Sequence, residues 1–232
     1  MKEDDAPPFL HAAKQKLKRL VPGSLLEQRQ IVLRLGPAGR TYASLRFLDA
    51  VGIRTPNERL APQETRSFLF VCFGNIMRSA LAEVLMKQAL CETGHEPEVR
   101  ILSAGLHATI GNPAHRWAQQ AASDLGVSLA DHRARLLSPE MVEQSDAILA
   151  MDFQNKAELL TLYPAHAEKI FMLSAYAEGD LRCRQIEDPY FTNLDGTLLC
   201  GRQIQTCIRN LILAIFASSR ETKRETDQTP GR

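Results

Sequence analysis

The feature that most constrains the fold of this chain is a short apolar run that leads through a polar loop into a helix. Residues Phe68 to Val71 are apolar and predict a buried strand, and the stretch that begins at Ser79 predicts a helix. The loop between them runs from Cys72 to Arg78, with five residues separating the thiol from the guanidinium. A strand that enters a helix in this way favours an α/β fold with the loop at one edge of the sheet.

The loop has the composition of an oxyanion site. Its backbone N–H groups converge, and the following helix N-terminus adds partial positive charge, so an oxyanion binds there. The same field stabilises a thiolate at Cys72, which makes it a nucleophile near neutral pH. Arg78 can hold two oxygens of a phosphate at once. We therefore interpret Cys72 as a nucleophile and Arg78 as the residue that binds the phosphate.

Three further residues support this interpretation. Gly74 lets the backbone pass close to a ligand, and Asn75 tolerates a left-handed conformation that bends the loop. Ser79 lies where its hydroxyl could donate to the thiolate. The alternative is a buried structural cysteine before an ordinary helix cap, since cysteine is often a core residue. Gly74, Asn75 and Ser79 together favour the phosphate site.

The stretch 71–79, with sequence VCFGNIMRS, resembles the signature of the low-molecular-weight protein tyrosine phosphatases. The Gly74-Asn75 and Arg78-Ser79 pairs make the match specific, and the similarity runs from about 68 to 217. The resemblance implies hydrolysis of phosphotyrosine-type phosphomonoesters through a phosphocysteine intermediate, without metal or cofactor. It also implies that the loop side of the site binds substrate through Phe73, Gly74, Asn75, Ile76 and Met77.

The resemblance implies roles for four residues outside the loop. Asp188, in an Asp-Pro-Tyr turn that is common in proteins, matches the family's general acid, and Tyr190 would form a wall for an aromatic ring. Ser103 and His132 match positions that support the phosphate loop through hydrogen bonds reaching Asn75. A plain exposed loop histidine is the alternative for His132.

The chain also departs from the family pattern. Met77 stands where many members carry a second loop cysteine, and Ala80 replaces the usual proline after the Arg-Ser pair. The stretch 107–111 lacks the aromatic residue that often lines the wall opposite Tyr190. These departures concern substrate preference and redox protection and leave the residues of the phosphatase chemistry in place.

Beyond the loop, apolar runs alternate with helical patterns. Nearly all-apolar strands separated by helices predict a four-stranded parallel sheet with helices on both faces, an α/β three-layer sandwich. The first strand ends in the Cys72 loop, at the carboxyl edge where such sheets bind ligands. The further expected strands are 99–105, 147–151 and 169–173, and the expected helices are 79–93, 113–125, a short one from 138, 155–163 and 198–218.

The charge distribution divides the chain near residue 66. Residues 1–66 hold 12 Lys and Arg against 7 Asp and Glu, and residues 67–232 hold 16 against 20. Helical patterns at 9–20, 25–35 and 38–51 and a break-rich linker at 55–63 predict a helical N-terminal extension over 1–66. We expect a catalytic domain over 67–218 and a polar, disordered tail over 219–232.

The extension has two open interpretations. It could dock a protein partner or a membrane surface, or it could pack on the core or on itself with solvated basic faces. Every catalytic candidate lies at Cys72 or beyond, so we expect the extension to leave the chemistry intact.

Composition excludes several classes of function. A net charge of +1 gives no ground for nucleic-acid binding, and five cysteines without paired short spacings argue against a disulfide scaffold or a zinc site. The first residues are charged and lack an apolar core, so we expect no signal peptide, and the longest apolar run, 211–217, is too short to span a bilayer. The reduced cytoplasm is the expected location. The expected partners are a phosphotyrosine-bearing protein or a small aryl phosphate.

Rival functions remain open at this point. An arsenate reductase shares this fold and loop but passes a disulfide along further cysteines, and Cys200 and Cys207 have the six-residue gap that such a pair uses. They follow Asp188, however, whereas that family's pair precedes its acid, and they fall on a predicted helix. In the second alternative the chain is a phosphoprotein-binding pseudo-phosphatase, and the N-terminal helices carry its function. A regulatory or scaffolding role could also accompany phosphatase activity.

Overall fold

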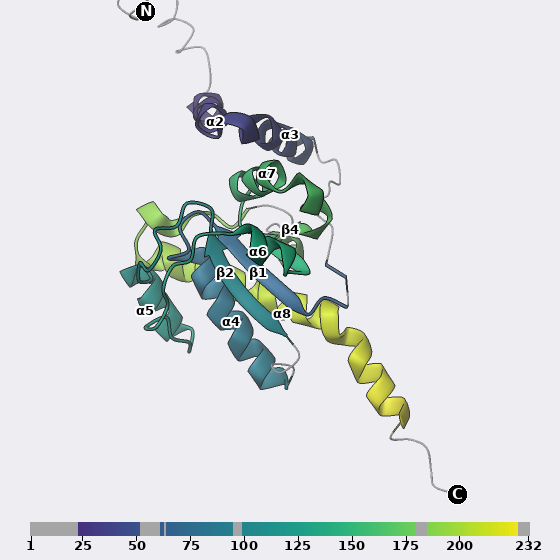
Figure 1. Ribbon diagram of the computed structural model, residues 1–232. Helices are drawn as coiled ribbons and strands as arrows, with labels where there is room; N and C mark the ends of the chain where they lie inside the picture. Colours follow the sequence, from purple (N-terminus) through teal and green to yellow (C-terminus); the bar gives the residue numbers. More distant parts are fainter. Residues whose placement is uncertain (1–22, 52–60, 63, 95–98, 180–184, 227–232) are drawn as a thin grey trace, which may run out of the picture.

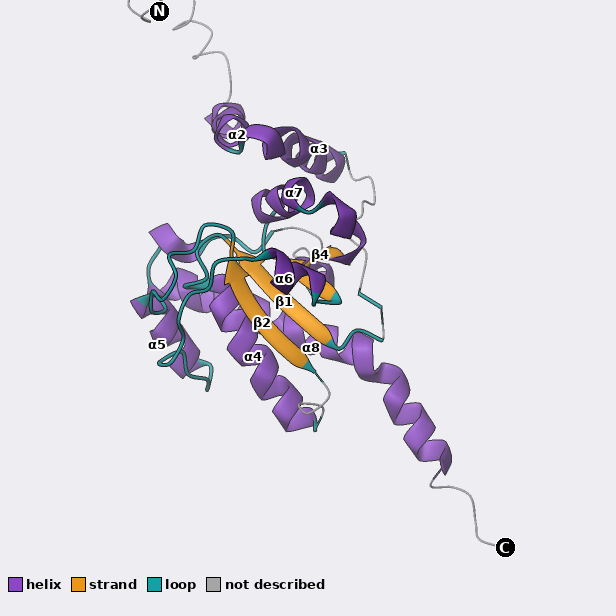
Figure 2. Ribbon diagram, in the orientation of Figure 1, coloured by secondary structure: helices purple, strands orange, loops and turns teal. Residues whose placement is uncertain are grey.

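The fold is built around a parallel sheet (Figures 1 and 2). The computed structural model describes residues 23–51, 61–62, 64–94, 99–179 and 185–226. These residues form four strands in the order β2-β1-β3-β4, so β1 lies inside the sheet with a neighbour on each side. The strands are β1 Ser67–Cys72, β2 Arg100–Gly105, β3 Ala147–Ala150 and β4 Ile170–Met172. All neighbouring strands pair in parallel, as the sequence predicts.

Helices cover both faces of the sheet, which confirms the three-layer α/β architecture. Alternate residues of β1 face opposite ways: Phe68 and Phe70 pack with the apolar cluster that includes α4 and α8, and Leu69 and Val71 pack with the cluster that includes α7. All six residues of β1 are buried, which explains why this strand reads as an apolar run with no polar face. The helices of the two faces are α4 Arg78–Thr93, α5 Arg116–Asp124 and α8 Leu194–Thr226 on one, and α6 Pro139–Glu143 and α7 Phe153–Leu162 on the other.

The N-terminal extension packs on the outer side of α7 (Figure 1). Its described part consists of α2 Gly23–Arg34, the 3₁₀ turn η2 Gly36–Ala38 and α3 Gly39–Ala50. Tyr42 and Leu45 of α3 are buried in the same apolar cluster as Phe153 and Ala157 of α7. Of the two interpretations of the extension, packing on the core therefore describes these helices.

Several helix ends differ from the expected ones for local reasons. Helix α7 begins two residues before 155, because the Asp152 carboxylate caps it by accepting a hydrogen bond from the Asn155 backbone N–H. Helix α5 begins three residues after 113, because Pro113 pairs with Arg133 in a bridge and His115 caps the helix.

The last helix is longer than expected at both ends. It runs from Leu194 to Thr226, so the first residues of the tail expected over 219–232 are helical, and 227–232 lie outside the described residues. The expected helix over 9–20 and most of the linker over 55–63 also lie outside them. No helix in the described ranges is both long and apolar enough to cross a membrane.

Candidate active site

The loop between β1 and α4 wraps around the Cys72 sulfur. Asn75 adopts the left-handed conformation expected for it, with φ of 53°, and its backbone N–H donates to Cys72 Sγ at 3.3 Å. Gly105, at the end of β2, makes this fold of the loop possible. A Cβ atom at Gly105 would lie 2.8 Å from backbone atoms of Phe73, Gly74 and Asn75, so any larger residue would push the loop away.

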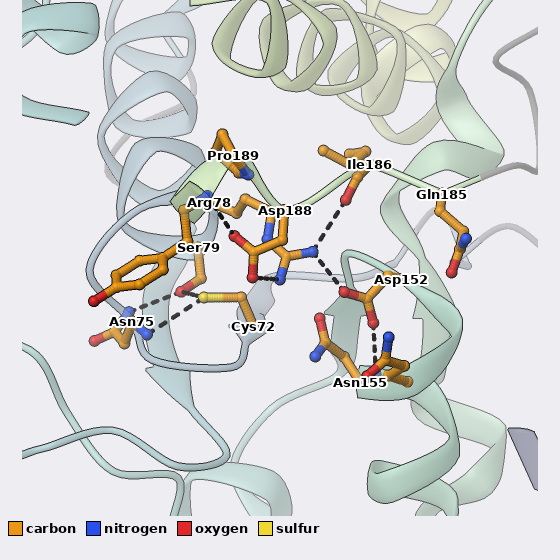
Figure 3. A network of polar contacts seen from close by, with 12 residues as sticks. Cys72, Asn75, Arg78, Ser79, Asp152, Asn155, Gln185, Ile186, Asp188 and Pro189 are labelled. Atoms are coloured by element: carbon orange, nitrogen blue, oxygen red, sulfur yellow. Dashed lines mark hydrogen bonds and ion pairs between the residues drawn. The ribbon is translucent and has the colours of Figure 1, made fainter. Parts of the chain in front are cut away.

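A second donor reaches the sulfur from the first turn of α4. Ser79 Oγ lies 2.9 Å from Cys72 Sγ, and Asn75 Nδ2 donates to the same oxygen at 2.9 Å (Figure 3). The Ser79 hydroxyl can donate its hydrogen to the sulfur or to the Ala104 carbonyl oxygen, which is 3.4 Å away. Cys72 and Ser79 are both buried, so these bonds form in a medium of low dielectric constant. The Asn75 backbone N–H and the Ser79 side chain thus both contact the Cys72 sulfur.

Arg78 lies buried between two carboxylates. Its Nη1 is 2.5 Å from Asp152 Oδ2 and donates to the Ile186 carbonyl at 3.0 Å, and its Nη2 is 2.7 Å from Asp188 Oδ2 (Figure 3). Burial by itself lowers the pKa of the guanidinium, but the charges of Asp152 and Asp188 outweigh it and raise that pKa above its usual value. Arg78 is therefore a permanent positive charge held in one orientation beside the sulfur.

Asp152 is a site residue that the sequence analysis missed. It is buried and directly precedes α7. Its Oδ1 caps that helix at the Asn155 backbone N–H, and its Oδ2 forms the ion pair with Arg78. The signal that could have found it is its place after the apolar run of β3, next to β1 in the sheet. A carboxylate at the carboxyl end of a neighbouring strand lies at the edge where the loop lies.

Asp188 and Tyr190 lie beside the loop, as the resemblance implies. Asp188 Oδ1 accepts from the Tyr190 backbone N–H at 3.2 Å and so caps the short turn η8 Pro189–Phe191. The Asp188 side chain is 44% exposed, whereas Asp152 is 13% exposed at the other end of Arg78. Asp188 is thus the carboxylate of the pair that solvent and a ligand can reach.

A chain of hydrogen bonds holds the loop from behind. Asn75 Nδ2 donates to Ser103 Oγ at 2.8 Å, and Ser103 Oγ donates to Glu83 Oε2 at 2.5 Å. Asn75 Oδ1 accepts from the Arg135 backbone N–H at 2.8 Å, and the Arg135 guanidinium forms an ion pair with Glu83. Ser103 is therefore placed as expected, while Glu83 and Arg135 are partners that no sequence signal identified.

His132 supports the same loop through its backbone. Its Nε2 lies 2.6 Å from the Asn75 carbonyl oxygen and, as a neutral ring, donates to it. Burial lowers the pKa of His132, although the bond to Asn75 acts in the opposite direction. The loop thus has supports at both the side chain and the carbonyl of Asn75, and His132 is half-buried rather than an exposed loop histidine.

We expect Glu83→Gln to weaken the fold. The substitution removes the charge that faces Arg135 and turns one acceptor of a buried group into a donor, so about 2 kcal/mol of unfolding free energy should be lost. Urea unfolding followed by circular dichroism measures this loss. Glu92→Gln is the matched control on the same helix, because the Glu92 side chain is exposed, and it should change the stability by less than about 0.5 kcal/mol. Equal stabilities of the two variants would contradict the supporting role of Glu83.

The site opens into a cavity of about 550 Å³. Phe73 is half exposed on its wall, and its ring lies against that of His107 with centroids 4.6 Å apart. Tyr190, also half exposed, contributes a second aromatic surface. Phe73 thus places an aromatic ring beside the stretch 107–111, which has no Phe, Tyr or Trp of its own. Besides Cys72, Arg78, Asp152 and Asp188, the cavity is lined by Arg34, Phe73, Gly74, Ile76, Met77, His107, Thr109, Asn112, Gln154, Asn155, Glu158, Tyr190 and Phe191.

The two cysteines that suggested a disulfide relay are unsuited to it. Cys200 and Cys207 are both buried on α8, and burial raises the pKa of each thiol to about 12. Seven residues of helix span about 10 Å, more than the roughly 7 Å at which two cysteine Cα atoms can be bridged. The arsenate reductase alternative therefore loses the feature that favoured it.

Comparison with known proteins agrees with the geometry. The family model described as "Low molecular weight phosphotyrosine protein phosphatase" matches residues 67–225. The "Probable low molecular weight protein-tyrosine-phosphatase EpsP" of Ralstonia nicotianae is 35% identical over 125 residues, which cover 54% of this chain and 79% of EpsP. The crystal structure of the tyrosine phosphatase amsI of Erwinia amylovora matches with a TM-score of 0.59 and 32% identity, over 67% of this chain and 98% of amsI.

A third relative differs in the substrate that its name states. A cysteine-to-serine mutant of the YwlE arginine phosphatase, with a phosphorylated active site serine, matches with a TM-score of 0.60 and 27% identity, over 66% of this chain and 98% of that protein. The family match begins where β1 begins and therefore leaves the N-terminal helices aside. Since the family match spans more than half of the sequence, the chain belongs to the low molecular weight phosphotyrosine protein phosphatase family.

Proposed function

We propose that this chain hydrolyses phosphotyrosine-type phosphomonoesters through a phosphocysteine intermediate. Arg78 and the loop N–H groups bind the phosphate dianion, and the Cys72 thiolate attacks phosphorus. The P–O bond to the phenol breaks as the S–P bond forms, and Asp188 gives its proton to the leaving phenolate oxygen. A water molecule then attacks the phosphocysteine and loses a proton to Asp188, which releases inorganic phosphate and restores the thiolate.

One observation carries this proposal. The described structure brings Cys72, Arg78 and Asp188 to one cavity although Arg78 and Asp188 lie 110 positions apart in the sequence. Asp188 must be protonated when the leaving group departs. The buried Asp152 keeps Arg78 oriented when Asp188 exchanges its contact with Arg78 for the leaving-group oxygen.

The aromatic walls support an aryl phosphate as substrate. Phe73 and Tyr190 are large side chains that remain half exposed where they line the cavity, which suits them to pack on a phenyl ring. A phosphorylated arginine is the competing substrate, because one structural relative is an arginine phosphatase. The substrate panel therefore contains a phosphotyrosine peptide and a phosphoarginine peptide of the same sequence.

The decisive experiment measures p-nitrophenyl phosphate hydrolysis in the presence of a metal chelator, beside thioredoxin-coupled reduction of arsenate. Hydrolysis without arsenate reduction supports the phosphatase. Arsenate reduction without hydrolysis would assign the reductase activity, and binding of the phosphopeptide with neither activity would assign a pseudo-phosphatase. If the phosphoarginine peptide is hydrolysed faster than the phosphotyrosine peptide, the proposed substrate class changes from an aryl phosphate to phosphoarginine. We expect the enzyme to work in the cytoplasm, where thiols such as Cys72 stay reduced.

We also propose that residues 1–66 are an addition to a catalytic domain that can act without them. A chain shortened to begin near residue 64 should fold and hydrolyse p-nitrophenyl phosphate, because Cys72, Arg78 and Asp188 are all retained. Its stability should fall by a few kcal/mol, since it loses the buried Tyr42 and Leu45, each worth about 1.5–3 kcal/mol. Circular dichroism and a rate assay check both statements. A shortened chain that is folded but inactive would show that the extension takes part in the chemistry.

A further inference from the structure

The N-terminal extension reaches the active-site cavity through one side chain. Arg34 is the last residue of α2, and it lines the same cavity as Cys72 and Arg78, although every candidate from the sequence lies at Cys72 or beyond. Its Nη2 donates to Gln154 Oε1 at 2.7 Å, and Gln154 in the first turn of α7 also lines the cavity. Arg34 is exposed, so it lies at the rim of the cavity that Asp152 and the phosphate loop also line.

The position of Arg34 is set by packing. Ala38, Tyr42 and Leu45 follow it in the chain and are buried in the apolar cluster that includes Phe153 of α7. The guanidinium of Arg46 lies over the Phe153 ring, 5.8 Å from its centroid. The extension is thus fixed to the helix whose first turn borders the site, and Arg34 is held beside that turn.

Arg34 differs from the other charged side chains that line the cavity in the groups that it contacts. Arg78 pairs with Asp152 and Asp188, and Glu158 Oε2 lies 2.6 Å from His107 Nε2. Among the described residues Arg34 meets only the neutral amide of Gln154 and has no carboxylate within ion-pair distance. A guanidinium carries five N–H donors in a planar fork, so most of them remain available to an incoming anion.

From this geometry we propose that Arg34 selects substrates that carry a carboxylate beside the phosphorylated residue. This inference rests on the proposed function and names the class of substrate. The cavity has the volume of a site for a drug-sized ligand, so it can hold groups next to the phosphorylated side chain. A glutamate or aspartate of the substrate that enters over α7 meets Arg34 at the rim, where opposite charges also steer the encounter.

The test uses the full-length chain and two phosphotyrosine peptides that differ only in glutamates or glutamines next to the phosphotyrosine. The wild type should show a higher kcat/KM for the glutamate peptide. In Arg34→Gln the ratio of the two kcat/KM values should fall by about three- to fivefold, as expected for an exposed ion pair, and Arg34→Glu should reverse the preference. Raising the salt from 0.1 to 1 M should shrink the wild-type ratio, because the screening length falls from about 10 to 3 Å.

Arg29→Gln is the matched control. It makes the same change of charge on the same helix at an exposed residue that does not line the cavity, and it should keep the wild-type ratio. The inference is overturned if Arg34→Gln and Arg29→Gln change the ratio equally, or if Arg34→Gln slows both peptides by the same factor. A wild-type chain that hydrolyses p-nitrophenyl phosphate but treats both peptides alike overturns the inference and leaves the proposed function standing. A wild-type chain inactive on all three substrates refutes both.

Discussion

Replacing Cys72 by serine is expected to lower phosphatase turnover by about 10⁵-fold or more, the order of loss seen when a catalytic nucleophile is removed. The serine hydroxyl is a far weaker nucleophile than a thiolate, and the described site places no general base within hydrogen-bond distance of Cys72 Sγ to activate it. Phosphate binding should persist, because the loop N–H groups and Arg78 remain. Stopped assays with p-nitrophenyl phosphate and calorimetric titration with phosphate measure the two quantities.

Cys91→Ser provides the control for this experiment. Cys91 is an exposed cysteine on α4, the helix that follows the loop, and it does not line the cavity, so its loss should leave turnover and phosphate binding as in the wild type. Substantial hydrolysis by Cys72→Ser would refute the covalent mechanism. Loss of phosphate binding together with turnover would show instead that the sulfur is needed to hold the loop in its binding conformation.

The sequence predicted the parts of the site that depend on local chain geometry. The apolar run of β1, the five-residue spacing from Cys72 to Arg78, and the residue suited to a left-handed conformation at Asn75 all lie within a few residues of one another. Such features depend on the backbone of one segment, so a pattern in that segment is enough. The resemblance then supplied Asp188, which spacing alone could not distinguish from an ordinary turn.

The parts that escaped prediction depend on contacts between distant segments. Glu83 matters because its carboxylate meets Ser103 and Arg135 across the back of the loop, and Gly105 matters because a Cβ atom at that position would lie only 2.8 Å from the loop backbone. A glutamate on a helix and a glycine at a strand end are common features with no pattern of their own. Arg34 is the extreme case, since it reaches the cavity only through the docking of α3 on α7.

The N-terminal extension also shows that a change in net charge along the chain need not mark the limit of the active-site cavity. The change in net charge near residue 66 coincides with the start of β1 and of the family match. The basic residues before that boundary still include one that borders the active site. A segment added outside a family's common fold can therefore alter substrate choice without contributing a group to the reaction itself.

Asp188→Asn should slow the hydrolysis of phenyl phosphates by about 10²–10⁴-fold, the usual contribution of a general acid. An amide cannot give up a proton to the departing phenolate oxygen, whereas it can keep the hydrogen bond that the Asp188 carboxylate accepts from the Tyr190 N–H. The loss should depend on the leaving group. A phenolate that is already stable needs no proton, so a nitrophenyl phosphate should lose less than unsubstituted phenyl phosphate does.

The Asp152→Asn variant distinguishes the loss of the general acid from the loss of a carboxylate that orients Arg78. Both Asp152 and Asp188 contact the Arg78 guanidinium, but only Asp188 is assigned as the acid. In Asp152→Asn the acid is intact, so the rate should fall by a similar factor for good and poor leaving groups as Arg78 loses its buried partner. In Asp188→Asn the plot of log kcat against leaving-group pKa should become steeper, because negative charge on the phenolate is no longer neutralised. Measuring both variants across a series of substituted phenyl phosphates tests the assignment. An Asp188→Asn variant with wild-type rates on the poorest leaving groups would mean that another group of the cavity donates the proton, and a steeper plot for Asp152→Asn would identify that group.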